Sequence, residues 1–146
     1  MDTIKQLREE TGLSFSQIKK ALDEVGGDVE KAREKLKEMS ASQAEKKADR
    51  EIAAGAIGSY VHNTRIMGAQ VVLGCETDFV AKNPEFVILA DNIAMHAAAM
   101  NPESIEEMLA QAYVKDGEVT VQELINQHIQ KFGENLKLVQ MNRFSI

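Results

Sequence analysis

The side chains best suited to covalent chemistry in this sequence are one cysteine and three histidines. Cys75 with His62, His96 or His128 could in principle form a thiolate–imidazole pair, in which the imidazole activates the sulfur as a nucleophile. None of the four residues lies in a recognisable catalytic motif, and Cys75 ends an apolar run of the kind that forms a buried strand. We therefore interpret Cys75 as a structural cysteine and predict no catalytic residues.

Spacing also argues against a metal or nucleotide site. The histidines are isolated from one another, without the His-x-x-x-His or Cys-x-x-Cys patterns of zinc sites, so we predict no metal ion and no other cofactor. The glycines at Gly55, Gly58, Gly68 and Gly74 do not form the G-x-x-x-x-G-K-[ST] loop that holds phosphates. They are typical of strands that pack closely or carry a bulge. The protein itself is not expected to hold a nucleotide.

The remaining candidate for function is the stretch Thr77-Asp78-Phe79-Val80, where an acid and a large apolar ring stand together between a predicted strand and a predicted helix. Two interpretations are open. Most phenylalanines pack in the core, and Phe79 could do so beneath the neighbouring strands. Alternatively, Asp78 and Phe79 could form a presented contact surface, because binding groups concentrate on loops held by a rigid scaffold.

Composition and charge limit the kind of partner. The 146 residues carry a formal net charge of −6, and 44% are hydrophobic, which is typical of a folded globular protein. Nucleic-acid binders usually carry a basic surface, so a protein partner is expected and direct nucleic-acid binding is not. The single cysteine cannot form an intrachain disulfide and favours a reducing compartment. No apolar stretch resembles a signal-peptide core or a membrane span, so we expect a cytoplasmic protein without membrane contacts.

Residues 1–40 are predicted to form a module of three short helices. Ser14 and Gln17 have the spacing of a capping box, which places a helix start at residue 14. Gly26-Gly27 ends that helix, and Asp28 can cap the next one. Apolar residues recur at helical spacing in all three segments, so their stripes can meet in one small bundle.

Residues 41–52 differ in character, because they are charged nearly all round. Ser42 and Glu45 have the spacing of another capping box, which predicts a separate linker helix over this range. A helix with so little apolar surface usually bridges two folded parts. The boundary between the module and the rest of the chain is therefore placed here.

Residues 53–146 are predicted to form an α+β core domain. Two β-branched and aromatic runs joined by Asn63-Thr64-Arg65 indicate a hairpin, and the alternating C-terminal tail can add a third antiparallel strand. Apolar residues at helical spacing between them indicate helices that cover the sheet. The predicted elements are strands at 55–62, 66–75 and 136–146, and helices at 84–101, 104–112 and 120–132, the last closed by Gly133.

Several motifs, in this order, resemble bacterial translation elongation factor Ts. The TDFV signature of that family stands at Thr77–Val80, and the resemblance spans the whole chain. In the motif FGENL at 132–136, this chain has Phe132 where the family usually has isoleucine. The matching segments are TG followed by KKAL within 11–22, GGD at 26–28, KKADRE at 46–51, SYVHNTRIMG at 59–68, CETDFVAKN at 75–83, AMH at 94–96 and FGENL at 132–136.

The resemblance implies that the protein is a guanine-nucleotide exchange factor for elongation factor Tu, the GTPase that carries aminoacyl-tRNA to the ribosome. In relatives, an Asp-Phe pair projects from the core and the ring enters a pocket of the GTPase domain. There it displaces a helix that helps to hold the magnesium ion, and GDP is released. The corresponding residues here are Asp78 and Phe79, flanked by Thr77 and Val80.

Further partner contacts are implied at Lys19, Phe132, Gly133 and His62. The N-terminal module resembles ubiquitin-associated domains and in the family docks on the same GTPase domain, where Lys19 matches a lysine that approaches a carboxylate. Phe132 and Gly133 match a helix end that supports the wedge, and His62 matches a histidine that reaches the far domain of elongation factor Tu. Each of three assignments has an alternative that needs no partner. Lys19 could be a solvated lysine, Gly133 a helix cap and His62 a solvent-facing strand residue.

The resemblance also bears on assembly. The chain contains one copy of a core that longer family members duplicate, so we predict a homodimer through the sheet, as in short, single-core family members. The alternative function is a non-catalytic adaptor whose helical module binds a ubiquitin-like partner. The TDFV segment favours the exchange factor over the adaptor, because an adaptor does not need it.

Overall fold

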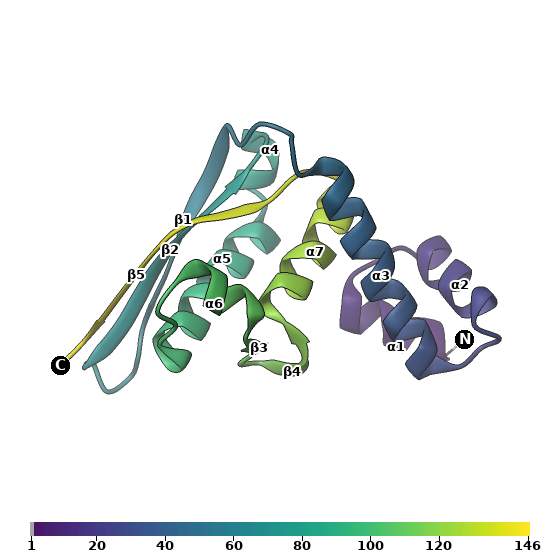
Figure 1. The fold of residues 1–146 in the computed structure, drawn as a ribbon, viewed down its shortest axis with the longest axis horizontal. Helices are drawn as coiled ribbons and strands as arrows, with labels where there is room; N and C mark the ends of the chain where they lie inside the picture. The colour runs from purple at the N-terminus through teal and green to yellow at the C-terminus, as the bar shows by residue number, and fades with distance from the viewer. Residues whose placement is uncertain (1) are drawn as a thin grey trace.

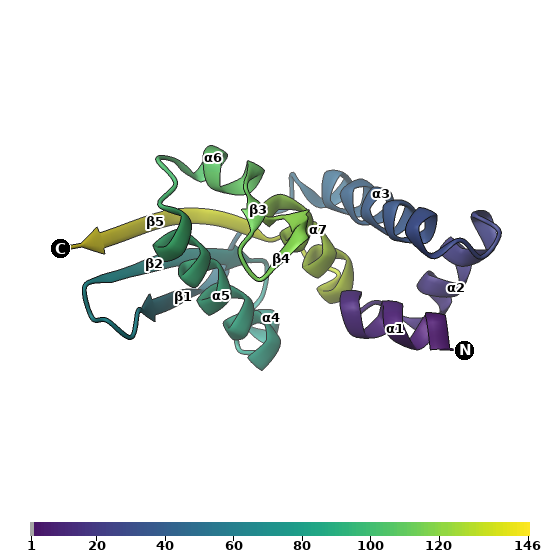
Figure 2. The same cartoon turned by 90° about the horizontal axis from the view of Figure 1, so that it is seen from below.

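The computed structural model describes residues 2–146. Within that range the chain forms seven helices, a three-stranded antiparallel sheet and a two-stranded hairpin, so the predicted α+β class is confirmed. The sheet lies at one end of an elongated molecule and the first two helices at the other (Figures 1 and 2). In chain order the elements are α1 (Asp2–Thr11), α2 (Phe15–Glu24), α3 (Val29–Lys47), β1 (Ala54–Val61), β2 (Met67–Cys75), α4 (Asp78–Ala81), α5 (Pro84–Met100), α6 (Ile105–Ala110), β3 (Ala112–Tyr113), β4 (Asp116–Thr120), α7 (Val121–Phe132) and β5 (Lys137–Ser145).

Helix α2 begins and ends where the sequence predicts, and α3 begins at its predicted cap, Asp28. The Ser14 hydroxyl accepts a hydrogen bond from the Gln17 backbone amide, and the Gln17 side chain accepts one from the Ser14 amide, which completes the predicted capping box. Gly26 and Gly27 follow α2 with φ of +68° and +85°, a backbone conformation that L side chains rarely adopt. The apolar stripes meet in a small separate core of Leu7, Leu13, Ile18, Ala21, Ala32 and Leu36.

Helix α3 contradicts one prediction. It runs without interruption from Val29 to Lys47, so no helix starts at Ser42 and the predicted cap there is wrong. The charged second half of α3 is stabilised by tertiary contacts along α7. The Ser40 hydroxyl donates to the Gln130 side-chain oxygen at 2.5 Å, and Ala44 packs against the larger core.

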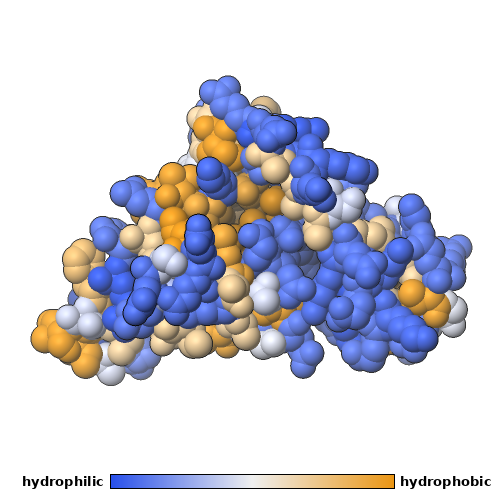
Figure 3. All heavy atoms as spheres, viewed as in Figure 1, coloured by the Kyte–Doolittle hydropathy of each residue, from blue (hydrophilic) through white to orange (hydrophobic). Residues whose placement is uncertain are grey.

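Polar groups dominate the junction between the N-terminal helices and the remainder. The Lys37 ammonium donates to the Glu118 carbonyl oxygen at 2.7 Å and lies 3.8 Å from the Glu123 carboxylate. A cleft with charged walls separates α1 and α3 from the β3–β4 hairpin. In Figure 3 the surface over the N-terminal helices is mostly hydrophilic, whereas apolar surface gathers over the end that holds the sheet. The core of the three N-terminal helices therefore stays separate from the larger core around the sheet, although α3 contacts α7.

The sheet has the order β1-β2-β5 and confirms the predicted hairpin and C-terminal strand. Helix α5 packs on β1 and β2 and supplies much of the larger core (Figure 1). The approach is closest at Gly58, where an added Cβ would lie 2.1 Å from the Ala90 carbonyl oxygen. Glycine at this position lets the helix backbone reach the strand. The buried centre includes Val71, Leu73, Phe86, Leu89, Ile93, Ile125 and Ile129.

The segment after α6 differs from the prediction. The helix ends at Ala110 instead of 112, and the next residues form the β3–β4 hairpin, which was not predicted. This segment is held by the buried ring of His96, which accepts a hydrogen bond from the Val114 amide at 3.1 Å and bonds the Gln111 side chain at 2.8 Å. A two-residue strand carries no alternation that a sequence pattern could reveal.

Candidate partner-binding site around Phe79

Phe79 lies on α4, a single helical turn at the end of β2. Thr77 caps this turn, because its hydroxyl accepts a hydrogen bond from the Val80 amide at 3.4 Å. Phe79 is 91% exposed and Asp78 is also exposed, whereas Val80 is buried in the larger core. The core interpretation of Phe79 is therefore wrong. Successive side chains on a helix are rotated by about 100° around its axis, so Val80 can face the core while Phe79 points outward.

A carboxylate from a distant part of the chain holds the start of this turn. Oε1 of Glu134 accepts hydrogen bonds from the backbone amides of Glu76 and Thr77, both at 3.0 Å. Oε2 of Glu134 accepts a third bond from the Thr77 hydroxyl at 2.6 Å. Hydrogen bonds to an ionised acceptor are stronger than neutral ones. Both oxygens of Glu134 are thus used to fix the two residues that precede Asp78.

A second set of polar contacts fixes Glu134 in turn. The buried Asn135 donates its backbone amide to the Glu76 carboxylate at 2.7 Å and its side-chain amide to the Arg50 carbonyl oxygen at 2.9 Å. The Arg50 guanidinium lies 3.5 Å from the Glu76 carboxylate and donates to the Gly133 carbonyl oxygen at 3.4 Å. The end of α7, the end of β2 and the connection after α3 therefore meet at one point.

Sequence reasoning missed Glu76, Glu134 and Asn135 as members of this site. Glu134 and Asn135 lie within FGENL, which was noticed only as a family motif. The single sequence signal was an acid and an amide directly after a predicted helix end. That signal could not identify the segment that they contact, because Glu134 lies 57 residues from Thr77 in the chain.

Phe132 and Gly133 lie at the end of α7, next to this network. Gly133 adopts φ of +72° and its amide bonds the Ile129 carbonyl oxygen, as expected for a residue that closes a helix. Phe132 is half-buried and meets the buried Phe86 edge to face, with ring centroids 6.2 Å apart. Gly133 therefore closes α7, and Phe132 packs against α5 and presents only part of its ring to the surface.

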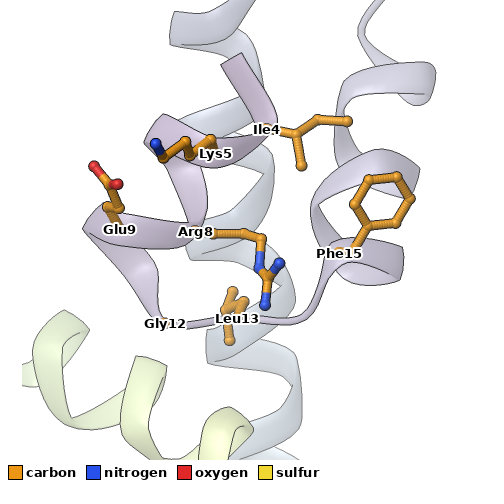
Figure 4. A pocket seen from close by; sticks show the side chains of 7 residues that line it. All are labelled: Ile4, Lys5, Arg8, Glu9, Gly12, Leu13 and Phe15. Atoms are coloured by element: carbon orange, nitrogen blue, oxygen red, sulfur yellow. The ribbon is translucent and has the colours of Figure 1, made fainter. Parts of the chain in front are cut away.

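Lys19 lies elsewhere, on the exposed side of α2. Beside it, α1 and the start of α2 form a shallow groove that includes Arg8, Leu13 and the half-exposed Phe15. In Figure 4 the ring of Phe15 and the side chain of Ile4 face each other across the groove, while the Arg8 guanidinium extends toward Leu13. An apolar floor whose edge carries two basic side chains and one acidic one suits an amphipathic segment with an acid among its charges.

His62 follows β1 at the hairpin tip, the end of the sheet opposite α4 (Figure 1). Its Nδ1 lies 2.9 Å from the Tyr60 hydroxyl, so the ring is partly buried and does not simply face solvent. The outer face of the sheet near it is apolar and exposed, with Ile57 at 67% and Phe144 at 66% exposure. Lys19, His62 and Phe79 thus occupy three separate surfaces.

Two of the groups first considered for chemistry, Cys75 and His96, are built into the core. Burial raises the pKa of the Cys75 thiol, which donates to the Thr77 carbonyl oxygen at 3.3 Å. Burial also lowers the pKa of His96, and the hydrogen bond to Gln111 only partly opposes this effect. Among residues 2–146 no cluster of His, Cys, Asp and Glu could hold a metal ion. Over the same range no helix combines the length and the apolar character that crossing a membrane requires.

Fold and site together define an α+β protein that presents one aromatic ring on a turn clamped by a distant carboxylate. Residues 76–146, which include this turn and its clamp, match the family model for elongation factor Ts. The whole chain is similar to curated proteins named elongation factor Ts. One from Clostridium perfringens (strain 13) is 44% identical over 143 residues, which are 98% of this chain and 46% of the relative. One from Clostridium acetobutylicum is 42% identical over 142 residues, 97% of this chain and 46% of the relative.

A more distant relative from Clostridium botulinum (strain Alaska E43) is 39% identical over 144 residues, 99% of this chain and 47% of the relative. The chain is therefore similar over nearly its whole length to elongation factor Ts proteins. It spans about half the length of the curated relatives that it matches.

Proposed function

We propose that this chain is a guanine-nucleotide exchange factor that binds elongation factor Tu in its GDP-bound and nucleotide-free forms, in the cytoplasm during translation elongation. Phe79, with Asp78 beside it, enters the GTPase domain and disturbs the elements that hold magnesium and phosphate. GDP then leaves and GTP can bind. The chain contributes no covalent chemistry to this step.

The observation that carries the proposal is the 91% exposure of Phe79 on a turn that the chain itself holds in place. Exposing a phenylalanine leaves a large apolar surface in water, which a pocket on a partner would remove. Nucleotide and exchange factor weaken each other's binding by the same factor, because the coupling is reciprocal. Each tenfold weakening of GDP binding needs about 1.4 kcal/mol of differential contact, so surfaces beyond one ring are required.

The N-terminal helices supply a second contact in this proposal. Residues 1–40 act as a docking module, residues 41–52 connect it to the core domain at 53–146, and Lys19 pairs with a carboxylate on the GTPase domain. The apolar and basic groove beside Phe15 supports this role. Met1, the first residue of the module, lies outside the described residues.

A homodimer through the outer face of the sheet is part of the same proposal. Exposed apolar residues on that face, Ile57 and Phe144 among them, support it, because burying them between two sheets removes apolar area from water. In the dimer, His62 of the second protomer contacts the far domain of elongation factor Tu. A monomeric mass at micromolar concentration in light scattering would contradict the dimer without touching the role of Phe79.

Release of labelled GDP from purified elongation factor Tu tests the exchange activity directly. The chain is expected to accelerate release in a concentration-dependent manner, and excess unlabelled GDP should be exchanged without being hydrolysed. A chain that binds elongation factor Tu in a pull-down but leaves the release rate unchanged would contradict the proposal. Loss of binding on charge reversal at Lys19, compared with reversal at Lys31, an exposed lysine of α3 outside the groove, locates the second contact.

A further inference from the structure

We propose that Glu134 is a positioning residue for nucleotide exchange, which fixes the turn that presents Phe79 before the partner arrives. This inference rests on the exchange function proposed above and assigns to Glu134 an effect exerted through the turn that carries Phe79. The juxtaposition that carries it is one carboxylate with three hydrogen bonds to the two residues preceding Asp78.

Helix α4 cannot hold its own conformation. It has four residues, and forming a first helical turn orders several backbone dihedrals for one or two hydrogen bonds. Phe79 adds little packing because it is exposed, so Val80 is the main apolar anchor within the turn. The small side chain of Ala81 also packs against the core, but two neighbouring apolar contacts restrain the rotation of the turn only weakly. A further restraint is needed to set the direction in which the ring projects.

Glu134 supplies that restraint at the N-terminal side of the turn. The amides of Glu76 and Thr77 converge on one oxygen, and the Thr77 hydroxyl takes the other. The same Thr77 hydroxyl caps α4 through the Val80 amide. The carboxylate therefore orients the capping residue itself, and through it the whole turn.

The position of Glu134 is fixed from behind. Asn135 is buried and bridges the Glu76 carboxylate and the Arg50 carbonyl oxygen, so the residue next to Glu134 cannot shift easily. Gly133 on its other side ends α7 in a left-handed conformation. The clamp is thus supported by the helix end and by a buried polar contact.

A fixed ring changes binding in a defined way. If the turn sampled several orientations, only the fraction with the ring in the competent direction would bind, and the apparent dissociation constant would rise by the inverse of that fraction. The maximal rate of GDP release, reached once the complex has formed, would not change. Loss of the clamp is therefore expected to raise the half-saturating concentration and to leave the plateau.

The test compares Glu134→Gln and Glu134→Ala with the unaltered chain in GDP release from elongation factor Tu over a range of concentrations. Glu134→Gln keeps the shape of the side chain and one acceptor oxygen, so it preserves the fold while it removes the charge. We expect its half-saturating concentration to rise about tenfold, and that of Glu134→Ala to rise further, with similar plateaus. Glu106→Gln, which neutralises an exposed carboxylate in the first turn of α6, is the matched control and should behave as the unaltered chain.

Amide hydrogen exchange, measured by NMR without the partner, separates positioning from general destabilisation. In Glu134→Gln the amides of residues 76–81 should exchange faster, while those of β2 and α5 keep their protection. Faster exchange throughout the core would show a structural role and overturn the inference. An unchanged half-saturating concentration in Glu134→Ala, with an active unaltered chain, would overturn it as well. Failure of the unaltered chain to release GDP overturns the proposed function instead, whatever the variants do.

Discussion

Phe79 and Phe86 are seven residues apart and lie in opposite environments. Phe79 is 91% exposed on α4, whereas Phe86 is fully buried on the first turns of α5. Phe86 belongs to a helical stripe with Leu89 and Ile93 that faces the sheet. Phe79 has only Val80 beside it, and that residue takes the inward position. A ring without an apolar stripe of its own is thus left outside, where it can act on something other than this fold.

The comparison assigns different work to the two rings. Burial of Phe86 stabilises the core, because apolar area is removed from water and the ring packs against Phe132. Exposure of Phe79 contributes little to stability, and polar bonds behind it hold the turn. Variants of the two residues should therefore separate stability from exchange activity.

The largest expected effect is on folding. Phe86→Ala should lower the free energy of unfolding by about 3–5 kcal/mol, because the substitution leaves a cavity in the core under α5. Urea denaturation followed by circular dichroism measures this loss. Phe79→Ala is the matched control and should shift the free energy of unfolding by no more than about 0.5 kcal/mol. Equal losses of unfolding free energy in the two variants would contradict the assignment of a stabilising role to Phe86 alone.

The reverse pattern is expected in nucleotide exchange. Phe79→Ala should reduce the stimulated release of GDP from elongation factor Tu by more than about tenfold, which corresponds to at least ~1.4 kcal/mol of lost contact. Phe79→Leu keeps apolar volume and should retain part of the activity. Stopped-flow release of a fluorescent GDP analogue provides the measurement. Stimulation by Phe79→Ala at the level of the unaltered chain would remove Phe79 from the proposed site.

The pH dependence of stability tests the burial of His96 on α5. Burial lowers the pKa of His96 below its ordinary value of 6.5, so the unfolded chain binds a proton that the folded chain does not. Stability is then fully present above about pH 7 and declines as the pH falls toward the folded-state pKa, by at most ~1.4 kcal/mol per pH unit. The pKa of His128 is also lowered by burial, so His96→Gln should reduce this slope without abolishing it. Urea midpoints between pH 7.5 and 5.5 measure it, and an unaltered slope would contradict the assignment.

The smallest effect is expected at an ion pair near the surface of the N-terminal helices. Arg33 donates from Nε and Nη2 to the two oxygens of Glu10, each at 2.9 Å, and these hydrogen bonds lower the pKa of Glu10. The pair is partly exposed, so Glu10→Gln should cost less than about 1 kcal/mol at pH 7. The contribution is present above the unfolded-state pKa of 4.5 and is lost as the pH falls through the lower folded-state pKa. Urea midpoints of Glu10→Gln and the unaltered chain should therefore converge near pH 2 and in 1 M salt.

Local signals in the sequence predicted most of the elements. The capping box predicted at Ser14, the helix start predicted at residue 120 and the helix end predicted at Gly133 agree with the structure. Those signals succeed because cap and helix are neighbours in the chain. The cap predicted at Ser42 is wrong, because contacts with distant residues outweigh the local signal there. A single capping box competes with helix continuation, and contacts of Ser40 and Ala44 with α7 and the core favour continuation.

The candidate site was predicted only in part. The TDFV segment drew attention to Phe79, and the alternatives of core packing and presentation could not be separated by its spacing alone. The clamp from Glu134 and the brace from Asn135 went unnoticed, although both lie in a motif that was seen. The β3–β4 hairpin was missed because its order depends on the buried ring of His96, which no local pattern reveals.

Local sequence patterns are enough to predict helix starts and ends, the alternation of the strands, the tight turn at 63–65 and the lack of recognisable catalytic motifs. These properties depend on residues within one or two turns of each other. Two features follow only from the tertiary structure. Val80 faces inward and Phe79 outward, and the Glu134 carboxylate binds Thr77, 57 residues away in the chain, and so holds the connection between β2 and α4. Such contacts form only when distant segments meet, because hydrogen bonds and packing depend on positions in space and not on spacing in the chain.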